Sequence, residues 1–340
     1  MKELCRFDVL CTRANCSRHH TCTANGESPE TEKCRYGFEC TRKKCPFRHD
    51  TLDGQSPRSD VVAAVPPPPS FHVELGTWNI LSEIQAAKMG PSEHYCEKVL
   101  DTDFRWSLLV SKLGGFMQKG FILCLQEVTR PGTLEKIEAL ASDFSYHVVF
   151  KTNGSMGNVV LVPPRFLMEK SHHIRVGAVC TLPSAQGFPH MLTSVLLKEK
   201  DTEAKFFVTT YHMPCQYKKP EVIKAHAEAL VRIFSAARYP FILAGDLNMT
   251  REEAVFHFPF WNLLEDDSPT THSCIRNTIF KGRLDHILWK FPGIEIKEVI
   301  PVVSVDTLMP NDTQPSDHEC VATVFHGNSR LCPHLLQPGL

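Results

Sequence analysis

The stretch PFILAGDLNM, residues 240–249, places an apolar run directly before two polar side chains. The run from Phe241 to Ala244 is typical of a strand. Asp246 and Asn248 lie at or just beyond its expected end. A carboxylate at the end of an apolar strand is where a sheet presents chemistry to a cleft. The stretch therefore predicts a strand with functional groups at its carboxyl end.

Other apolar runs carry polar side chains in the same way. They are Asn79 in LGTWNIL (75–81), Glu127 in FILCLQEV (121–128), His212 in FVTTYHMP (207–214), Asp285 in GRLDHIL (282–288), and Asp317 with His318 in PSDHECVATV (315–324). Carboxylates, amides and histidines gathered at one place suit a hard metal ion and a phosphate group. One polar side chain at the end of an apolar run arises easily by chance, whereas a whole set of them does not.

Strand and helix patterns alternate from residue 71 onward. Segments rich in Val, Ile, Phe and Thr predict strands at 71–80, 120–128, 146–150, 158–162, 194–198, 205–212, 240–246, 284–289 and 319–325. Apolar residues at spacings of three and four predict helices at 104–118, 132–144 and 220–237. Many strands with a few interposed helices favour an α/β sandwich.

The order of these motifs resembles the endonuclease/exonuclease/phosphatase superfamily. The motifs are an Asn, then Gln-Glu, His, Gly-Asp-x-Asn, Asp and Ser-Asp-His, and the resemblance covers about residues 71–327. Members include abasic-site endonucleases, deoxyribonuclease I-like enzymes, deadenylases, tyrosyl-DNA phosphodiesterases, inositol phosphatases and sphingomyelinases. The resemblance implies a four-layered α/β sandwich, in which two mixed sheets lie between helices.

The resemblance also implies a role for each motif residue. Glu127 would be the principal ligand of Mg²⁺ or Mn²⁺, with Asn79 beside it. Asp246 would orient and deprotonate the attacking water, and Asn248 would hold that water or the phosphate through its amide.

The histidines of the motifs would act on the phosphate. His318, oriented by Asp285, and His212 would donate hydrogen bonds to phosphate oxygens as charge builds up in the transition state. Asp317 would approach the metal or brace a second ion. The rivals of His212 for this role are His147, His190 and His272.

One departure from the superfamily pattern concerns the metal ligands. Some members have an acidic residue two positions after the Asn, where this chain has Leu81. A second carboxylate ligand next to Asn79 is therefore in doubt. Glu83 would reach the metal only if the turn allowed it.

Two segments near the start share one cysteine spacing: CRFDVLCTRANCSRHH (5–20) and CRYGFECTRKKCPFRH (34–49). Each reads Cys, five residues, Cys, four residues, Cys, three residues, His. Three thiolates and one imidazole make a closed tetrahedral shell, so the repeats predict two structural Zn²⁺ ions. The predicted ligands are Cys5, Cys11, Cys16 and His20 in the first repeat, and Cys34, Cys40, Cys45 and His49 in the second. His19 is a rival for His20, and Cys22 has no counterpart in either repeat.

The two repeats resemble the Cys-Cys-Cys-His zinc-finger family, whose members commonly bind single-stranded RNA. In the second repeat, aromatic and basic side chains such as Tyr36, Phe38, Lys43 and Arg48 are interleaved, which suits bases and phosphates. Residues 1–50 carry ten Lys or Arg against seven Asp or Glu, a net charge of +3, whereas the whole chain has a net charge of −1. The alternative is a pair of fingers that binds protein or is purely structural.

The chain of 340 residues is expected to have four parts. These are the fingers (1–50), a linker with four consecutive prolines (51–70), the catalytic domain (71–327) and a short tail (328–340). No apolar run of about 18 residues and no secretory signal is visible. We therefore expect a cytoplasmic or nuclear protein without membrane contact, and a monomer. In such a reducing compartment, clustered cysteines favour metal binding over disulfides.

The function expected from both regions is a metal-dependent phosphodiesterase that hydrolyses nucleic acid by activated-water attack. The fingers favour RNA over DNA and a deadenylase-like nuclease, because a tethered binding module raises the local concentration of the bound strand. The alternatives are a DNA-repair endonuclease or tyrosyl-DNA phosphodiesterase-like enzyme, then a small-molecule or lipid phosphodiesterase. A catalytically inactive RNA-binding adaptor is the alternative outside enzymes.

Overall fold

The structure, a computed structural model, describes residues 70–89, 95, 97–152, 154–215, 219–275, 278–291, 293–302 and 307–328. The predicted zinc ligands, the linker up to residue 69 and the tail from residue 329 lie outside these residues. Among the described residues, no helix is both long and apolar enough to span a bilayer.

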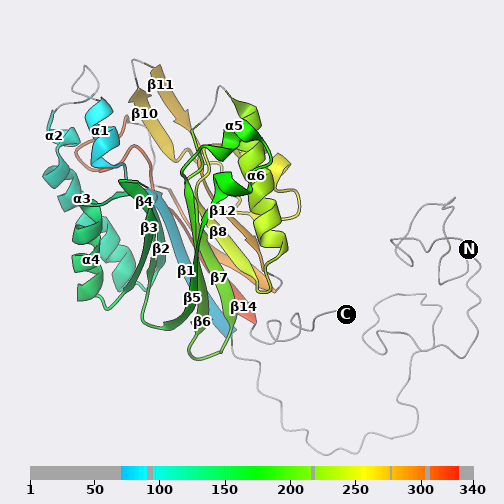
Figure 1. The fold of residues 1–340 in the computed structure, drawn as a ribbon. Helices are drawn as coiled ribbons and strands as arrows, with labels where there is room; N and C mark the ends of the chain where they lie inside the picture. Colours follow the sequence, from blue (N-terminus) through cyan, green and yellow to red (C-terminus); the bar gives the residue numbers. More distant parts are fainter. Residues whose placement is uncertain are drawn as a thin grey trace, which may run out of the picture. The chain divides into compact units, whose positions relative to one another are not determined.

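Two six-stranded sheets form the centre of the described domain (Figure 1). Across the first sheet the order is β13 (Ile294–Ile300), β14 (Val321–Asn328), β1 (Ser70–Asn79), β2 (Ile122–Thr129), β4 (Met156–Val162) and β3 (His147–Thr152). Across the second it is β5 (Phe166–Arg175), β6 (Met191–Glu199), β7 (Lys205–Thr210), β8 (Phe241–Asp246), β12 (Asp285–Lys290) and β9 (Asn262–Leu263). A two-stranded ribbon of β10 (Thr271–Ile275) and β11 (Thr278–Gly282) stands apart from both.

Both sheets are mixed, as the sequence predicted. β1 pairs with β2 in parallel, and β7 pairs with β8 in parallel, while the other pairs are antiparallel. All residues of β2 and β8 are buried, which explains why their sequences are almost continuously apolar.

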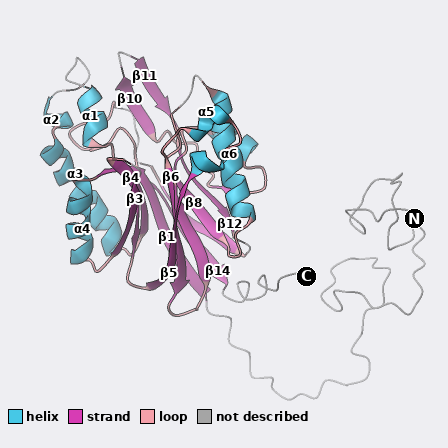
Figure 2. Ribbon diagram, in the orientation of Figure 1, coloured by secondary structure: helices cyan, strands magenta, loops and turns pink. Residues whose placement is uncertain are grey.

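Helices cover the outer faces of the two sheets (Figure 2). α3 (Thr102–Gln118) and α4 (Thr133–Asp143) contribute buried side chains to a core with the first sheet, and α6 (Pro220–Ser235) does so with the second. The side chain of Asp101 caps α3 by accepting a hydrogen bond from Phe104 N, and α6 begins with Pro220, which suits the first helical turn. The shorter helices are α1 (Glu83–Met89), α2 (Glu97–Leu100), η3 (Val176–Val179), α5 (Pro183–Gln186) and α7 (Arg251–His257).

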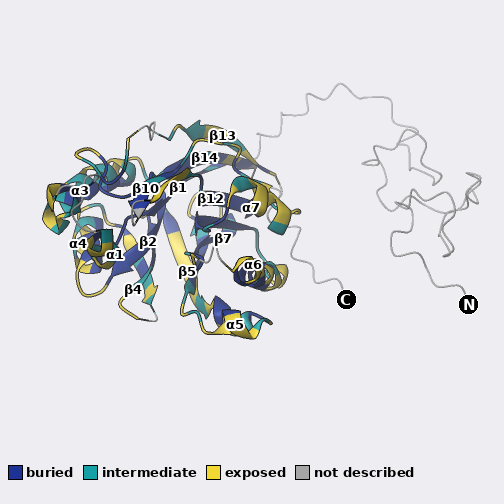
Figure 3. Ribbon diagram, turned by 90° about the horizontal axis from the view of Figure 1, so that it is seen from above, coloured by how far each residue is buried: buried dark blue, intermediate teal, exposed yellow. Residues whose placement is uncertain are grey.

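The largest apolar core lies between the two sheets. It joins side chains of β1, such as Val73 and Leu75, to side chains of the second sheet, such as Val208 and Ile242. All four of these side chains are fully buried, and the buried strands run through the middle of the domain (Figure 3). Burial of this apolar surface is the main source of stability of the sandwich. The layers are therefore helix, sheet, sheet, helix.

Five strands had not been predicted from the sequence: β5, β9, β10, β11 and β13. β5 and β13 are the outer strands of their sheets, and most of their side chains are exposed or half-buried. An outer strand has one neighbour and keeps polar residues, so its sequence lacks the apolar alternation of an inner strand. β9 has only two residues, and β10 and β11 form their own ribbon.

Candidate active site

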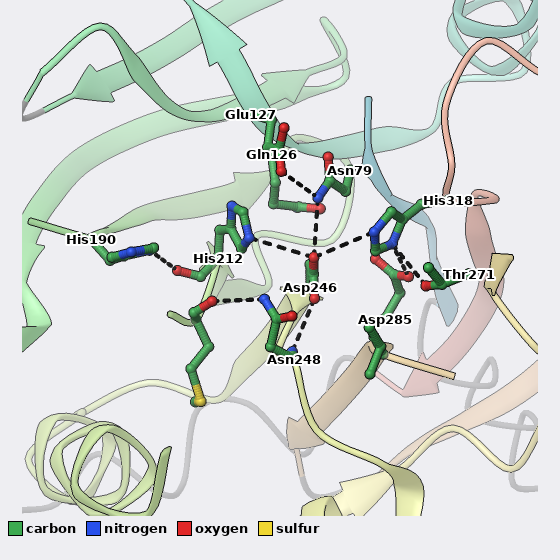
Figure 4. Close-up of polar contacts among 12 residues, drawn as sticks. Asn79, Gln126, Glu127, His190, His212, Asp246, Asn248, Thr271, Asp285 and His318 are labelled. Carbon is green, nitrogen blue, oxygen red and sulfur yellow. Dashed lines mark hydrogen bonds and ion pairs between the residues drawn. The ribbon is translucent and has the colours of Figure 1, made fainter. Parts of the chain in front are cut away.

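The two sheets bring the predicted polar side chains together at one end of the sandwich (Figure 4). In the first sheet Asn79 pairs with Gln126, which places Glu127 beside the end of β1. In the second sheet Asp246, the last residue of β8, pairs with Asp285, the first residue of β12. The site is therefore assembled from strand ends that belong to different sheets.

The amide of Asn79 connects the two sheets. Its Nδ2 donates hydrogen bonds to Glu127 Oε1 and to Asp246 Oδ2, each at 3.1 Å. Its Oδ1 accepts a hydrogen bond from Leu81 N at 3.0 Å. All of these groups are buried, so the contacts are protected from competition with water.

The backbone is in the left-handed region at three non-glycine residues of the site. φ is 53° at Leu81, 62° at Glu127 and 47° at Asn248. Such angles are uncommon outside glycine and cluster at functional sites. At Glu127 the positive φ coincides with a register shift between β2 and β4. This irregularity takes the Glu127 side chain out of the regular alternation of side chains between the two faces of the strand. Gln126 instead donates to Thr77 and Thr210, one residue from each sheet.

The carboxylate of Glu127 is held on both oxygens. Ser82 N and Ser82 Oγ each donate to Glu127 Oε2 at 3.0 Å, while Asn79 donates to Oε1. Glu83, the second acidic candidate near Asn79, instead accepts hydrogen bonds from Thr129 and Thr133. Glu83 therefore does not supply a second carboxylate beside Asn79.

His318 and Asp285 form a buried ion pair. His318 Nδ1 lies 2.8 Å from Asp285 Oδ2, and Thr270 Oγ1 donates to the same oxygen at 2.7 Å. Burial opposes the charge on the imidazole, but the carboxylates of Asp285, Asp317 and Asp246 outweigh it and raise the pKa of His318 well above its ordinary value. The pair therefore favours the protonated ring, with the proton on Nδ1 directed at Asp285.

Asp246 lies at the centre of the cluster. Its Oδ2 is 3.5 Å from His212 Nε2 and 3.8 Å from His318 Nε2, besides the bond from Asn79. Asn248 N donates to its Oδ1 at 2.9 Å. The Asn248 amide in turn donates to Met213 O at 2.8 Å, which fixes its orientation.

Asp317 precedes His318 and is buried in the same cluster. Burial raises the pKa of Asp317 to about 6, with Glu127 and Asp246 adding to the rise and the charge of His318 opposing it. Its Oδ1 is buried and has no hydrogen-bond partner among the described residues. A buried carboxylate oxygen without a partner is costly unless a cation or proton compensates it.

The acidic side of the cluster fits a hard divalent cation. Glu127, Asp246 and Asp317 carry carboxylate oxygens of the kind that Mg²⁺ and Mn²⁺ prefer, whereas Asn79 directs its NH₂ group at Glu127 and Asp246 and its Oδ1 at Leu81 N. Asp246, Asp285 and His318 place one ligand atom each within 4.8 Å of one another. Glu127 adjoins this group through its shared contact with Asn79.

The other histidine candidates occupy different places. His190 lies against His212, with ring centroids 5.6 Å apart, and its Nδ1 is 2.8 Å from His212 O. His147 is exposed on the outer strand β3, and His272 lies on β10. The described geometry thus favours His212 for contact with Asp246 and leaves His190 as its neighbour.

Sequence reasoning missed Arg105, a buried cation beside the cluster. It comes from α3 and donates to Pro315 O at 2.6 Å, Ile80 O at 3.0 Å and also Leu81 O. It thereby ties the loop that follows Asn79 to the loop that contains Asp317. A buried arginine inside an apolar helix pattern was the available signal, because such a residue needs partners.

A model of the endonuclease/exonuclease/phosphatase family matches residues 76–318. The 2',5'-phosphodiesterase 12 of Bos taurus is 24% identical over 285 residues, which cover 66% of this chain and 46% of the relative. The same-named protein of Homo sapiens is 23% identical with the same coverage. The chain therefore spans about half the length of these curated relatives.

Solved structures share the fold at low sequence identity. ANGEL2, described as a 2',3'-cyclic phosphatase in complex with adenosine-2',3'-vanadate, has a TM-score of 0.66 and 15% identity, and the match covers 76% of this chain and 96% of that one. The human Nocturnin catalytic domain has a TM-score of 0.59 and 20% identity, and the match covers 76% of this chain and 98% of that one. D. rerio TDP2 with a single-strand DNA product has a TM-score of 0.55 and 17% identity, and the match covers 75% of this chain and 98% of that one. The family model spans more than half of the sequence, and the chain thus belongs to the endonuclease/exonuclease/phosphatase family.

Proposed function

We propose that this chain is a metal-dependent phosphodiesterase that hydrolyses nucleic-acid phosphodiester bonds. The observation that carries the proposal is the surroundings of Asp246 Oδ2. Within 4 Å this one oxygen meets the amide of Asn79 and the Nε2 atoms of His212 and His318. A base flanked by two phosphate-binding donors is what hydrolysis by activated water requires.

In the proposed reaction, Asp246 accepts a proton from the attacking water as the water oxygen bonds to phosphorus. Asn248 holds Asp246 by its backbone N–H, and the bond from its amide nitrogen to Met213 O fixes the side chain that would hold the water or the phosphate. His318 carries its positive charge toward the phosphate oxygens, and Asp285 keeps its ring in position. The P–O bond to the leaving sugar oxygen then breaks, and that oxygen takes up a proton from the surrounding water.

The metal has a place on the other side of Asp246. Glu127 and Asn79 would hold Mg²⁺ or Mn²⁺, and Asp317 would join them or brace a second ion. The bound cation would neutralise phosphate charge and polarise the P–O bonds. Ser82 keeps Glu127 oriented through two hydrogen bonds, so this ligand is set before substrate arrives.

RNA is the substrate that we favour. The names of two similar proteins, a 2',5'-phosphodiesterase and a 2',3'-cyclic phosphatase, refer to bonds that exist only on a sugar with a 2'-oxygen. The two predicted Cys-Cys-Cys-His fingers with bound Zn²⁺ add an RNA-binding module, and a deadenylase-like nuclease follows from both. We further propose that the protein is a monomer, located in the cytoplasm or nucleus, that does not contact membranes.

The test compares substrates at equal concentration with the purified full-length chain. Labelled oligoadenylate, abasic duplex DNA, DNA with a 5'-tyrosyl end and a generic phosphodiester are each incubated with Mg²⁺ or a chelator. We expect Mg²⁺-dependent cutting that is fastest on RNA, and none by Asp246→Asn. Faster cutting of either DNA would replace RNA by DNA repair. If the chain binds RNA but cuts none of these substrates, it is an inactive RNA-binding adaptor.

A further inference from the structure

A pocket opens beside His212 on the Glu127 side of the site, and its far wall contains His190. Met156, Pro189 and Met191 provide apolar walls, and Asn158 adds an amide. We call this the His190 pocket. Because Glu127 and His212 line it together with His190, whatever fills it lies next to the proposed place of the scissile phosphate.

The ring of His190 is fixed on two sides. Its Nδ1 lies 2.8 Å from His212 O, and the ring meets that of His212 edge to face at 88° (Figure 4). Phe188 approaches it as well, with centroids 6.2 Å apart. A side chain held in this way presents its remaining nitrogen in one direction.

The bond to the backbone also fixes the tautomer. A carbonyl oxygen only accepts, so Nδ1 of His190 must carry a proton. Burial lowers the pKa of His190 to about 4, helped by His212, so at neutral pH the ring carries no second proton. Nε2 is therefore a hydrogen-bond acceptor, and no partner for it is found in the described part of the chain.

The amide of Asn158 follows the same logic. One N–H of its Nδ2 donates to Met191 O at 2.7 Å, which leaves Oδ1 as an acceptor and one N–H as a donor. The pocket thus offers two neutral acceptors and the carboxylate of Glu127, between apolar walls. A phosphate group would be repelled by this carboxylate and would meet few side-chain donors, whereas a sugar with hydroxyl groups would meet acceptors.

We propose that the His190 pocket binds the ribose that flanks the scissile phosphate, and that His190 Nε2 accepts a hydrogen bond from its 2'-hydroxyl. This inference rests on the proposed nuclease function and gives it a basis for choosing RNA over DNA. A site that pairs with a hydroxyl discriminates against the sugar that lacks it, because the acceptor is then left unpaired.

The first experiment varies the 2'-substituent of the substrate and uses the wild-type protein. Short oligoadenylates carry one internal nucleotide with a 2'-hydroxyl, a 2'-hydrogen or a 2'-fluorine, and the product ladder shows where cutting slows. Fluorine keeps the pucker of ribose but cannot donate. We expect kcat/KM at that position to fall about 10-fold for both replacements. Equal cutting of all three by the wild type would overturn the hydroxyl contact.

A variant then assigns the effect to Nε2. In His190→Asn the amide nitrogen can replace Nδ1 as donor to His212 O, but nothing replaces Nε2. We expect this variant to cut all three sugars alike, at the rate of the wild type on the 2'-hydrogen sugar. His147→Asn, on an exposed strand, is the matched control and should keep the preference.

The outcomes separate the two proposals. Undiminished preference for the hydroxyl in His190→Asn would overturn the role of His190 while the nuclease function stands. A wild-type chain that cuts no oligonucleotide would overturn the proposed function and this inference with it.

Discussion

His318 Nδ1 and Asp285 Oδ2 lie 2.8 Å apart, and both side chains are buried. The carboxylate comes from the first residue of β12, while the histidine belongs to the loop before β14, so the pair joins the two sheets. The carboxylates around His318 raise its pKa, which favours a positive charge on the ring. That charge is available where a phosphodiester would build up negative charge.

Replacing Asp285 tests what this charge contributes. In Asp285→Asn, His318 loses its principal carboxylate, so the pKa of His318 falls and the cation is lost. We expect kcat to drop by about 100-fold or more, with little change in KM. Steady-state kinetics with RNA measures this, and Asp143→Asn, on the exposed end of α4, is the control. An unchanged kcat would contradict a role for the pair.

Removal of a metal ligand can be followed without any substrate. We expect Mg²⁺ or Mn²⁺ to raise the melting temperature of the wild-type chain by several degrees, since a ligand at 100 times its Kd stabilises by about 2.7 kcal/mol. Glu127→Gln should lose most of this shift. Glu138→Gln, exposed on α4, should keep it. The melting temperature is measured by calorimetry. An equal rise in Glu127→Gln would show that Glu127 is not a metal ligand.

Arg105 is expected to matter for stability as well as for the site. In Arg105→Met, the carbonyl groups of Ile80, Leu81 and Pro315 lose their donor. We expect the free energy of unfolding to fall by about 3 kcal/mol, measured by urea denaturation. Arg130→Met, whose side chain is 66% exposed, should change it by less than about 0.5 kcal/mol.

Stability should fall as the solution is acidified below pH 6.5. Burial lowers the pKa values of His190, His226 and His286 to about 4 each, so the folded chain keeps them neutral while the unfolded chain protonates them. Their contribution is complete above pH 6.5 and is lost as the pH falls toward 4, at about 1.4 kcal/mol per pKa unit. Asp317, whose pKa is raised to about 6, acts in the opposite direction between pH 6 and 4.

Below pH 6.5 the three depressed groups outweigh Asp317, so the net slope there is positive. His318, whose pKa is raised, lowers stability only as the pH rises above 6.5. Melting temperatures between pH 4.5 and 6.5 measure the positive slope. His226→Gln removes one titrating group and should flatten the profile. A profile as steep as that of the wild type would show that His226 does not contribute.

The fingers predict a metal content that can be counted. The full-length chain should contain two zinc ions per molecule by elemental analysis, and Cys34→Ser should contain one, because a structural zinc site needs all four ligands. Cys215→Ser, an exposed free cysteine of the catalytic domain, should still contain two. Two ions in Cys34→Ser would remove this residue from the ligand set.

The inner strands and long helices could be predicted from the sequence because burial leaves a local record. β2 and β8 are apolar along their length, and α3, α4 and α6 show the helical spacing of apolar residues. The outer strand β5 leaves no such record, since its exposed residues Glu169, Lys170 and Ser171 would suit a loop equally well.

The site was predictable in its members and less so in its geometry. Residues such as Asp246 and Glu127 stand at the ends of apolar runs, which can be read locally. The bond from Asn79 to Asp246 spans 167 positions and depends on how two sheets stack. The contacts of Arg105 with Ile80 and Pro315 depend on the same packing, so no window of sequence contains them.

The division of the site between two sheets has a consequence for how the protein can evolve. Asn79 and Glu127 belong to one sheet, whereas Asp246 and Asp285 belong to the other. The distance between the proposed metal ligand and the proposed base is then set by apolar side chains packed between the sheets, such as Val208 and Ile242. We therefore expect selection for turnover to act also on side chains that never meet the substrate, because a methylene gained or lost there changes how the sheets pack.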